Sequence, residues 1–199
     1  MRFIESILFE NGKYYNLALH QKRINRTVEK FNPELKSLEL RDVVPQAAYR
    51  GRFKVRVTYD ISDEPISYDL EFVEYVPRAI ASLELVDAEK FDYSFKYEDR
   101  DMLNALKEQS KADDIIITIH GLITDSSYAN LAFWDGKKWL TPDAPLLDGV
   151  RRQQLIAANK IKEAPIRVAD LGAFEKVSLI NAMLDLEETM LTISQVLKR

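Results

Sequence analysis

The chain has 199 residues, of which 46% are hydrophobic and 30% charged, and it carries a formal net charge of −4. This composition is that of an ordinary globular protein, and the length allows a sizeable buried core. Its mild acidity gives no reason to expect nucleic acid or an anionic membrane as a partner. The absence of cysteine excludes disulfides and thiolate chemistry.

Metal binding and membrane insertion are not expected either. The two histidines, His20 and His120, lie far apart in the sequence, and no familiar metal-ligand spacing is present. The N-terminal residues lack the apolar run of a signal peptide, and no stretch approaches the roughly 18 apolar residues of a membrane span. We therefore expect a soluble, cytoplasmic protein without a metal site.

The first half of the chain predicts a strand, a helix and a hairpin. Residues 2–10 read as a strand that ends in Asn11-Gly12, a strong hairpin turn signal. Apolar residues recur at helical spacing over 14–31, and Asn32-Pro33 ends that helix. Residues 34–49 are ambiguous between a short strand and a short helix. Alternation over 51–60 and 67–76 indicates two strands joined by a turn.

The second half is richer in strands. The expected strands are 82–87, 115–119, a hairpin over 132–140, and 176–180, and the expected helices are 99–110, 149–160 and 184–197. The pattern predicts an α+β fold with a small N-terminal domain (1–78), a linker (79–84) and a larger domain (85–199). A cleft between two domains is a common place for a cofactor.

Taken one at a time, the residues that could carry chemistry are weak signals. Lys96 lies between a strand and a helix, and Arg23 lies on the polar side of an early helix; both are most simply solvated side chains. Asp125 fits a turn or a cap equally well. Gly149 precedes a helix, and the amides of a helix N-terminus bind phosphate well.

The order of four sequence blocks is more specific. IESILFENGKYYNLALHQKRINRT is followed by KYEDRDMLNAL, then by HGLITDSSYANLAFWDGKKWLTP and PLLDGVRRQQLI. Together these blocks resemble the class IV pyridoxal-phosphate (PLP) enzymes over almost the whole chain. That family includes branched-chain and D-amino-acid aminotransferases and aminodeoxychorismate lyases. The resemblance implies a two-domain fold, with a small α/β N-terminal domain, a strand-rich C-terminal domain and PLP in the cleft between them.

The resemblance also implies roles for individual residues. Lys96 is the expected catalytic lysine that bears the cofactor, and Arg23 is expected to bind the cofactor phosphate. Asp125 is expected to face the pyridine nitrogen and keep it protonated. The remaining expected cofactor contacts are the backbone amides of Val150 and Arg151, together with Asn181 and Ala182 on the phosphate side.

Some positions depart from the family pattern. Asp125 stands where the family usually has Glu, Asp99 where it has Asn, Asp148 where it has Pro and Arg151 where it has Thr. The short chain and the K-x-x-x-R pattern favour a lyase that releases pyruvate from aminodeoxychorismate and yields 4-aminobenzoate. A class IV aminotransferase is the alternative, and a catalytically degenerate small-molecule binding protein is a second one. The family also leads us to expect a homodimer.

Overall fold

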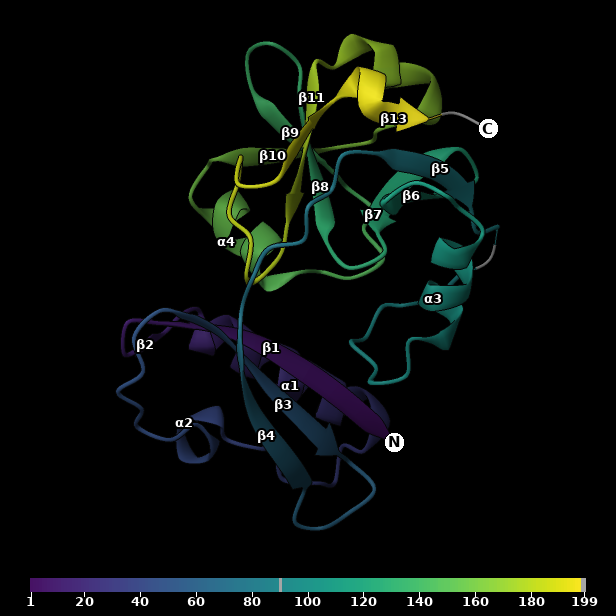
Figure 1. Ribbon diagram of the computed structural model, residues 1–199. Coiled ribbons are helices and arrows are strands. Elements are labelled where there is room, and N and C mark those ends of the chain that lie inside the picture. Colours follow the sequence, from purple (N-terminus) through teal and green to yellow (C-terminus); the bar gives the residue numbers. More distant parts are fainter. Residues whose placement is uncertain (90, 198–199) are drawn as a thin grey trace. The chain divides into compact units, whose positions relative to one another are not determined.

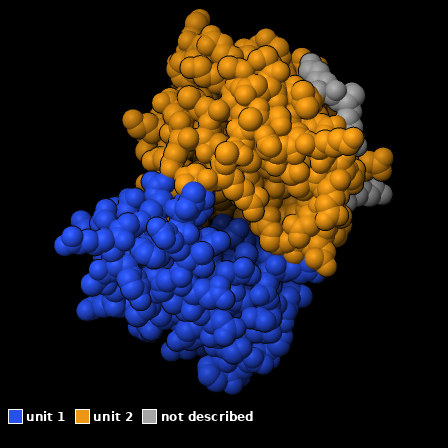
Figure 2. All heavy atoms as spheres, in the orientation of Figure 1, with its two compact units in different colours: residues 1–76, 95–99 blue, residues 77–94, 100–199 orange. Residues whose placement is uncertain are grey.

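The chain folds into two compact units (Figure 2). The structure is a computed structural model that describes residues 1–89 and 91–197. The first unit comprises Met1–Val76 and Phe95–Asp99, and the second comprises Pro77–Ser94 and Arg100–Arg199. The division into domains 1–78 and 85–199 stays a prediction. It does not include the return of Phe95–Asp99 to the first unit. Within the described residues, no helix is long and apolar enough to cross a membrane.

The first unit packs one long helix on an antiparallel sheet. Its elements are β1 (Arg2–Glu10), β2 (Lys13–Tyr14), α1 (Leu17–Phe31), α2 (Leu40–Val43), β3 (Arg52–Asp60) and β4 (Ser67–Glu74) (Figure 1). The strand order is β2-β1-β3-β4. Asn11 and Gly12 have φ angles of 50° and 84°, as the central residues of a type I′ turn require. The predicted hairpin and the predicted helix are therefore confirmed.

The core of the first unit lies between α1 and one face of the sheet. Alternate residues of β1 share a face, and Phe3 and Ile7 on this face pack against Ile24 and Val28 of α1. The same alternation places Glu5 on this face, where it is fully buried. A carboxylate therefore occupies a position at which the strand pattern calls for an apolar side chain.

The segment Phe95–Asp99 is attached to the first unit by backbone and ring contacts. The amide of Ile4 donates to the carbonyl oxygen of Lys96 at 2.9 Å, and Tyr97 forms an antiparallel bridge with Phe3. The ring centroids of Phe95 and Phe31 lie 4.8 Å apart. These contacts fix the backbone of Lys96 beside β1.

The second unit is built around a mixed sheet (Figure 1). Its elements are β5 (Leu83–Asp87), α3 (Asp101–Glu108), β6 (Asp114–Ile119), β7 (Leu122–Ser126), β8 (Asn130–Trp134), β9 (Trp139–Pro142), α4 (Val150–Ala157), β10 (Ile161–Ala164), the 3-10 helix η1 (Val168–Ala173), β11 (Lys176–Ile180), β12 (Met190–Thr192), the 3-10 helix η2 (Ile193–Gln195) and β13 (Val196–Leu197). The path of the sheet is β10-β9-β8-β7-β6-β5-β13, and β11 pairs with both β8 and β12.

One core of this unit contains Leu131 and Phe133 of β8, with Val177 and Leu179 of β11. A second, smaller cluster joins Leu155 of α4 to alternate side chains of the same two strands. Because β8 and β11 contribute to both clusters, they form the centre of the unit. Leu155 thereby packs α4 against this pair of strands.

The helix predicted over 184–197 is wrong. In its place the chain forms β12, η2 and β13, and β13 pairs in parallel with β5. Leu191 and Val196 are buried in the core of the unit, so the apolar spacing reflects burial rather than helical periodicity. The β-branched residues in this stretch also favour extended structure.

Candidate functional site

The first unit contains a buried cluster of charged and polar side chains around Glu5. Arg23 of α1 donates from Nε to Glu5 Oε1 at 2.8 Å and from a terminal nitrogen to Oε2 at 2.5 Å. Nδ1 of His20, one turn earlier on α1, lies 2.6 Å from Glu5 Oε2. His20 and Arg23 are three residues apart, so both project from the face of α1 that meets β1.

The protonation states of Glu5 and His20 determine which atoms of the cluster donate hydrogen bonds and which accept them. Burial by itself would raise the pKa of Glu5, but Arg23 and His20 outweigh it and hold this pKa at about 2. Burial lowers the pKa of His20, against the opposing effect of Glu5, and the charges of Arg23 and Lys96 lower it further. His20 is therefore neutral and donates from Nδ1 to the carboxylate. Its Nε2 is then an acceptor, and this buried atom has no hydrogen-bond partner among the described residues.

Lys96 belongs to the same neighbourhood. Its backbone is bonded to β1 through Ile4, and its charge acts on His20. The first unit therefore brings together Lys96 and Arg23, which lie far apart in the sequence. Glu5 and His20 are not among the site residues predicted from the sequence. The sequence does contain a pattern that could have identified Glu5, because Glu5 lies on the same face of the strand as the apolar residues Phe3 and Ile7. A carboxylate is stable at such a buried position only when it has a buried hydrogen-bonding or charged partner.

The second unit holds Asp125 in a buried hydrogen-bonded position on β7. Its two carboxylate oxygens accept from Nδ2 of Asn130 at 2.8 Å and from the amide of Leu147 at 2.9 Å. Burial raises the pKa of Asp125 to about 6, against the effect of these hydrogen bonds and of Arg152. The carboxyl group can therefore hold or release a proton near neutral pH.

Asn130 also fixes the loop that leads into α4. Its Nδ2 donates to the carbonyl oxygen of Leu147 at 2.8 Å. A Cβ atom on Gly149 would lie only 1.9 Å from Oδ1 of Asn130, so residue 149 has to be glycine for this packing. Asp125, Asn130 and the start of α4 are thus one packed group.

The first turn of α4 carries two buried arginines. Arg152 donates to the carbonyl oxygen of Pro142 at 2.8 Å and to Glu163 at 2.6 Å, so its charge is paired inside the fold. Arg151 is 8% exposed and donates to Gln154 on the same helix at 2.9 Å. The Nε atoms of Arg151 and Arg152 are both buried, and neither has a hydrogen-bond partner among the described residues.

The turn after β11 lies beside this helix start. Oδ1 of Asn181 accepts from the amides of Met183 and Leu184 at 2.8 and 3.1 Å, which closes the turn around Ala182. A terminal nitrogen of Arg151 lies 3.5 Å from a carboxylate oxygen of Asp185. This contact joins the turn to α4.

The sequence-predicted residues are therefore divided between the two units. The first unit brings together Arg23 and Lys96, and the second brings together Asp125, Val150, Arg151, Asn181 and Ala182. Their roles as cofactor ligands remain predictions.

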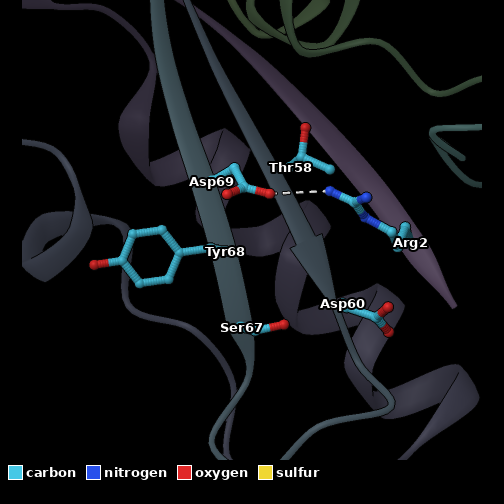
Figure 3. A pocket seen from close by; sticks show the side chains of 6 residues that line it. All are labelled: Arg2, Thr58, Asp60, Ser67, Tyr68 and Asp69. Carbon is cyan, nitrogen blue, oxygen red and sulfur yellow. Dashed lines mark hydrogen bonds and ion pairs between the residues drawn. The ribbon is translucent and has the colours of Figure 1, made fainter.

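A polar pocket of about 340 Å³ lies near the ends of β1, β3 and β4 (Figure 3). It is lined by Arg2, Thr58, Asp60, Ser67, Tyr68 and Asp69. Arg2 donates to Asp69 at 3.0 Å, and both side chains are largely solvent-exposed, which makes the pair energetically weak. The pocket contains none of the predicted site residues, so it is not part of the candidate site.

The donors in the second unit suit the phosphate of PLP. The first amides of a helix have no partner within the helix, and the macrodipole adds positive potential there. Arg151 and Arg152, on the first turn of α4, add positive charge, and the buried Nε of each lacks a hydrogen-bond partner among the described residues. Lys96 in the first unit supplies the primary amine that PLP requires. Each unit by itself therefore contains groups that fit one part of this cofactor.

Comparisons with known proteins agree with this fit. The family model described as "Amino-transferase class IV" matches residues 2–187. An uncharacterized protein of Haemophilus influenzae is 35% identical over 184 residues, which cover 90% of this chain and 96% of that protein.

The chain is also similar to solved structures, among them the following two. A Haemophilus somnus 129PT protein with the provisional name 4-amino-4-deoxychorismate lyase is 33% identical, with a TM-score of 0.86, and the match covers 93% of this chain and 97% of that one. A Mycobacterium tuberculosis protein provisionally named an aminotransferase, in its PLP-bound form, is 17% identical with a TM-score of 0.76. That match covers 94% of this chain and 80% of the other. The second likeness shows the fold alone.

Proposed function

The chain belongs to the class IV aminotransferase family and is a PLP-dependent enzyme, and on this premise we propose that it is an aminodeoxychorismate lyase. The reaction releases pyruvate from 4-amino-4-deoxychorismate and yields 4-aminobenzoate. The observation that carries this proposal is the match to the Haemophilus somnus protein of that provisional name, at 33% identity over nearly the full length of both chains. The Mycobacterium tuberculosis structure provisionally named an aminotransferase shares only 17%.

The proposed roles are those of Lys96 in the first unit and of Asp125 in the second unit. Lys96 holds the cofactor through Nζ, and the same amine, once released, moves the proton on the substrate carbon. Burial supports a protonation role for Asp125, because its pKa of about 6 lets the carboxyl group share a proton with the pyridine nitrogen. PLP, when bound, supplies the electron sink for the substrate carbanion.

The remaining roles in this proposal concern binding. The amides of Val150 and Arg151 bind the phosphate, and Asn181 and Ala182 close that side of the cofactor. The hydrogen bonds that close the turn through Asn181 support this placement, because they fix the backbone next to α4. Arg23 contributes positive charge within the first unit, where Glu5 pairs with it.

We also propose that the enzyme works in the cytoplasm as a homodimer. Both properties are carried over from the class IV resemblance, and the cysteine-free composition is compatible with a reducing compartment. Sedimentation velocity of the purified protein tests the dimer: a single species at twice the chain mass supports it, and a monomer at micromolar concentration contradicts it.

The cofactor and its anchor are tested by borohydride reduction in the presence of PLP, followed by digestion and mass spectrometry. We expect a phosphopyridoxyl group on Lys96 that is lost in Lys96→Ala. Lys160→Ala, an exposed position in the second unit, is the matched control and should keep the modification. Modification scattered over surface lysines, or none at all, would contradict the assignment and favour a degenerate binding protein.

Coupled assays then identify the reaction. A lyase forms pyruvate from aminodeoxychorismate without any added amino acceptor. An aminotransferase forms a keto acid from an amino acid only when an acceptor is present. Activity of the second kind alone, in protein labelled at Lys96, would replace the lyase proposal with the aminotransferase.

A further inference from the structure

We propose that Glu5 and His20 are positioning residues for the cofactor phosphate, because they hold the guanidinium of Arg23 in one orientation. The inference rests on the proposed function and on the expected contact of Arg23 with the phosphate of PLP. Glu5, His20 and Arg23 all belong to the first unit, so their mutual geometry is given within one compact part of the chain.

Glu5 binds one edge of the Arg23 guanidinium. Nε of Arg23 donates to Oε1 of Glu5 at 2.8 Å, and a terminal nitrogen donates to Oε2 at 2.5 Å. Two parallel hydrogen bonds between a planar guanidinium and a carboxylate fix the direction of the guanidinium as well as its position. Because Glu5 occupies the Nε edge, the edge formed by the two terminal nitrogens is the one that a phosphate can use.

His20 fixes the carboxylate of Glu5 in turn. Its Nδ1 lies 2.6 Å from Oε2 of Glu5 and donates to it, since His20 is neutral and Glu5 is ionised. Oε2 therefore accepts from both His20 and Arg23. Without the hydrogen bond from His20, only Arg23 would orient this carboxylate, and the two side chains could rotate together.

The exposure of the three side chains shows where this cluster can meet a ligand. The side chains of Glu5 and His20 are 0% and 1% exposed, whereas that of Arg23 is 9% exposed. Of the three, Arg23 is therefore the side chain that a ligand can contact. A buried ion pair is often no more stabilising than apolar side chains of similar volume, so this cluster fits a role in binding better than a role in stability alone.

Glu5 has two opposite effects on a bound phosphate. Its negative charge repels the phosphate. Its hydrogen bonds order Arg23 in advance, so that the arginine loses less rotamer entropy when the ligand binds. We expect the ordering effect to be larger, because the phosphate contacts Arg23 directly and Glu5 lies behind it. Supporting hydrogen bonds of this kind give a binding residue its precise geometry.

The test compares PLP with pyridoxal, which lacks the phosphate, in two variants of nearly equal shape. Both ligands are titrated into apoprotein, and their dissociation constants are read from absorbance and intrinsic fluorescence. His20→Asn keeps a donor near the position of Nδ1, and His20→Leu has none. For His20→Leu we expect the Kd for PLP to rise about tenfold, the scale of one hydrogen bond to a charged group, and the Kd for pyridoxal to stay within about twofold.

His20→Asn should restore most of the loss, to within about threefold of the unaltered protein for PLP. Lys22→Gln, which removes an exposed charge from the same helix, is the control and should change neither Kd. If circular dichroism shows that His20→Leu is unfolded, His20→Phe replaces it, because phenylalanine fills the volume of the ring and also lacks the donor.

A second comparison shows whether His20 acts through Arg23. The double variant Glu5→Gln/Arg23→Gln removes both charges of the buried pair together. In this background we expect His20→Leu to change the preference for PLP over pyridoxal by less than about twofold, because the guanidinium that it positions is gone. A loss as large as in the unaltered chain would mean that His20 acts independently of Arg23, which would overturn the proposal.

The outcomes separate this proposal from the proposed function. Equal preferences for PLP over pyridoxal in His20→Leu and His20→Asn would overturn the positioning role and leave the proposed function intact. Tighter PLP binding by Glu5→Gln would do the same, because that result is expected if Glu5 acts on the phosphate by charge alone. Failure of the unaltered protein to bind PLP at Lys96 would overturn both.

Discussion

Asp125 shows how burial sets the chemistry of a single carboxyl group. Its pKa is raised from 3.8 to about 6, so the folded state retains a proton that the unfolded chain releases. The contribution of this proton to the free energy of unfolding is fully present below pH 3.8 and is lost as the pH rises through 6. The shift corresponds to about 3 kcal/mol.

The prediction for Asp125 is a pH-dependent difference between two proteins. We expect the free energy of unfolding of the apoprotein, measured relative to Asp125→Asn, to fall by about 3 kcal/mol between about pH 4 and pH 7. Urea denaturation at several pH values measures it. A difference that stays constant with pH would mean that the Asp125 carboxyl group is solvated in the folded protein.

Glu5 shows the opposite effect, because the charge and hydrogen bonds of Arg23, together with the hydrogen bond from His20, outweigh burial. Its pKa is lowered from 4.5 to about 2, so the stabilisation is present above pH 4.5 and is lost as the pH falls through 2. We expect Glu5→Gln to reduce the free energy of unfolding at neutral pH by about 3–5 kcal/mol, since the buried Arg23 then loses the charge of its counter-ion Glu5.

A matched control for Glu5 lies on the same strand. Glu10 pairs with Arg52 at 3.1 Å, and both side chains are about one-third exposed. Glu10→Gln should therefore cost less than about 1 kcal/mol by the same urea denaturation assay. Equal losses of unfolding free energy in Glu5→Gln and Glu10→Gln would show that burial does not strengthen the contribution of Glu5 to stability.

At the scale of elements, the start of α4 depends on the close approach of the Asn130 side chain to Gly149. Gly149 has ordinary backbone angles, so its requirement comes from space: an added Cβ would displace Asn130, which holds both Asp125 and Leu147. We expect Gly149→Ala to destabilise the protein by about 2 kcal/mol or more, as overpacked sites do. The measurement is thermal unfolding, with Gly172→Ala as control because nothing lies within 4 Å of the added atom. An unchanged melting temperature for Gly149→Ala would contradict this.

The elements also show what the sequence could and could not predict. Strict periodicity gave α1 and the strands of the first unit, because one face of each is buried. The same reasoning failed at 184–197, where the chain forms β12, which pairs with the preceding strand β11, and β13, which pairs with the distant strand β5. Lys96 and Arg23 could be singled out only through the order of the family blocks. The buried pair of Arg23 with Glu5 could not be foreseen, because it depends on the packing of α1 against β1.

At the scale of the whole molecule, the path of the chain determines which unit holds Lys96. The chain leaves the first unit after Val76 and returns to it with Phe95–Asp99. This return completes an aromatic cluster, in which the ring of Tyr97 lies 5.2 Å from that of Phe3 and the ring of Phe95 lies 4.8 Å from that of Phe31. Lys96 lies between these two anchors, so its position depends on the packing of the first unit.

We therefore expect a fragment of residues 1–76 to be less stable than a fragment of residues 1–99. The difference should be about 3 kcal/mol, the scale of removing one buried aromatic ring, and urea denaturation measures it. The longer fragment with Phe95→Ala and Tyr97→Ala together serves as control and should resemble the shorter one. Equal stability of the two fragments would mean that the returning segment adds nothing to the first unit. In that case the backbone contact with Ile4 would be left to hold Lys96 in place.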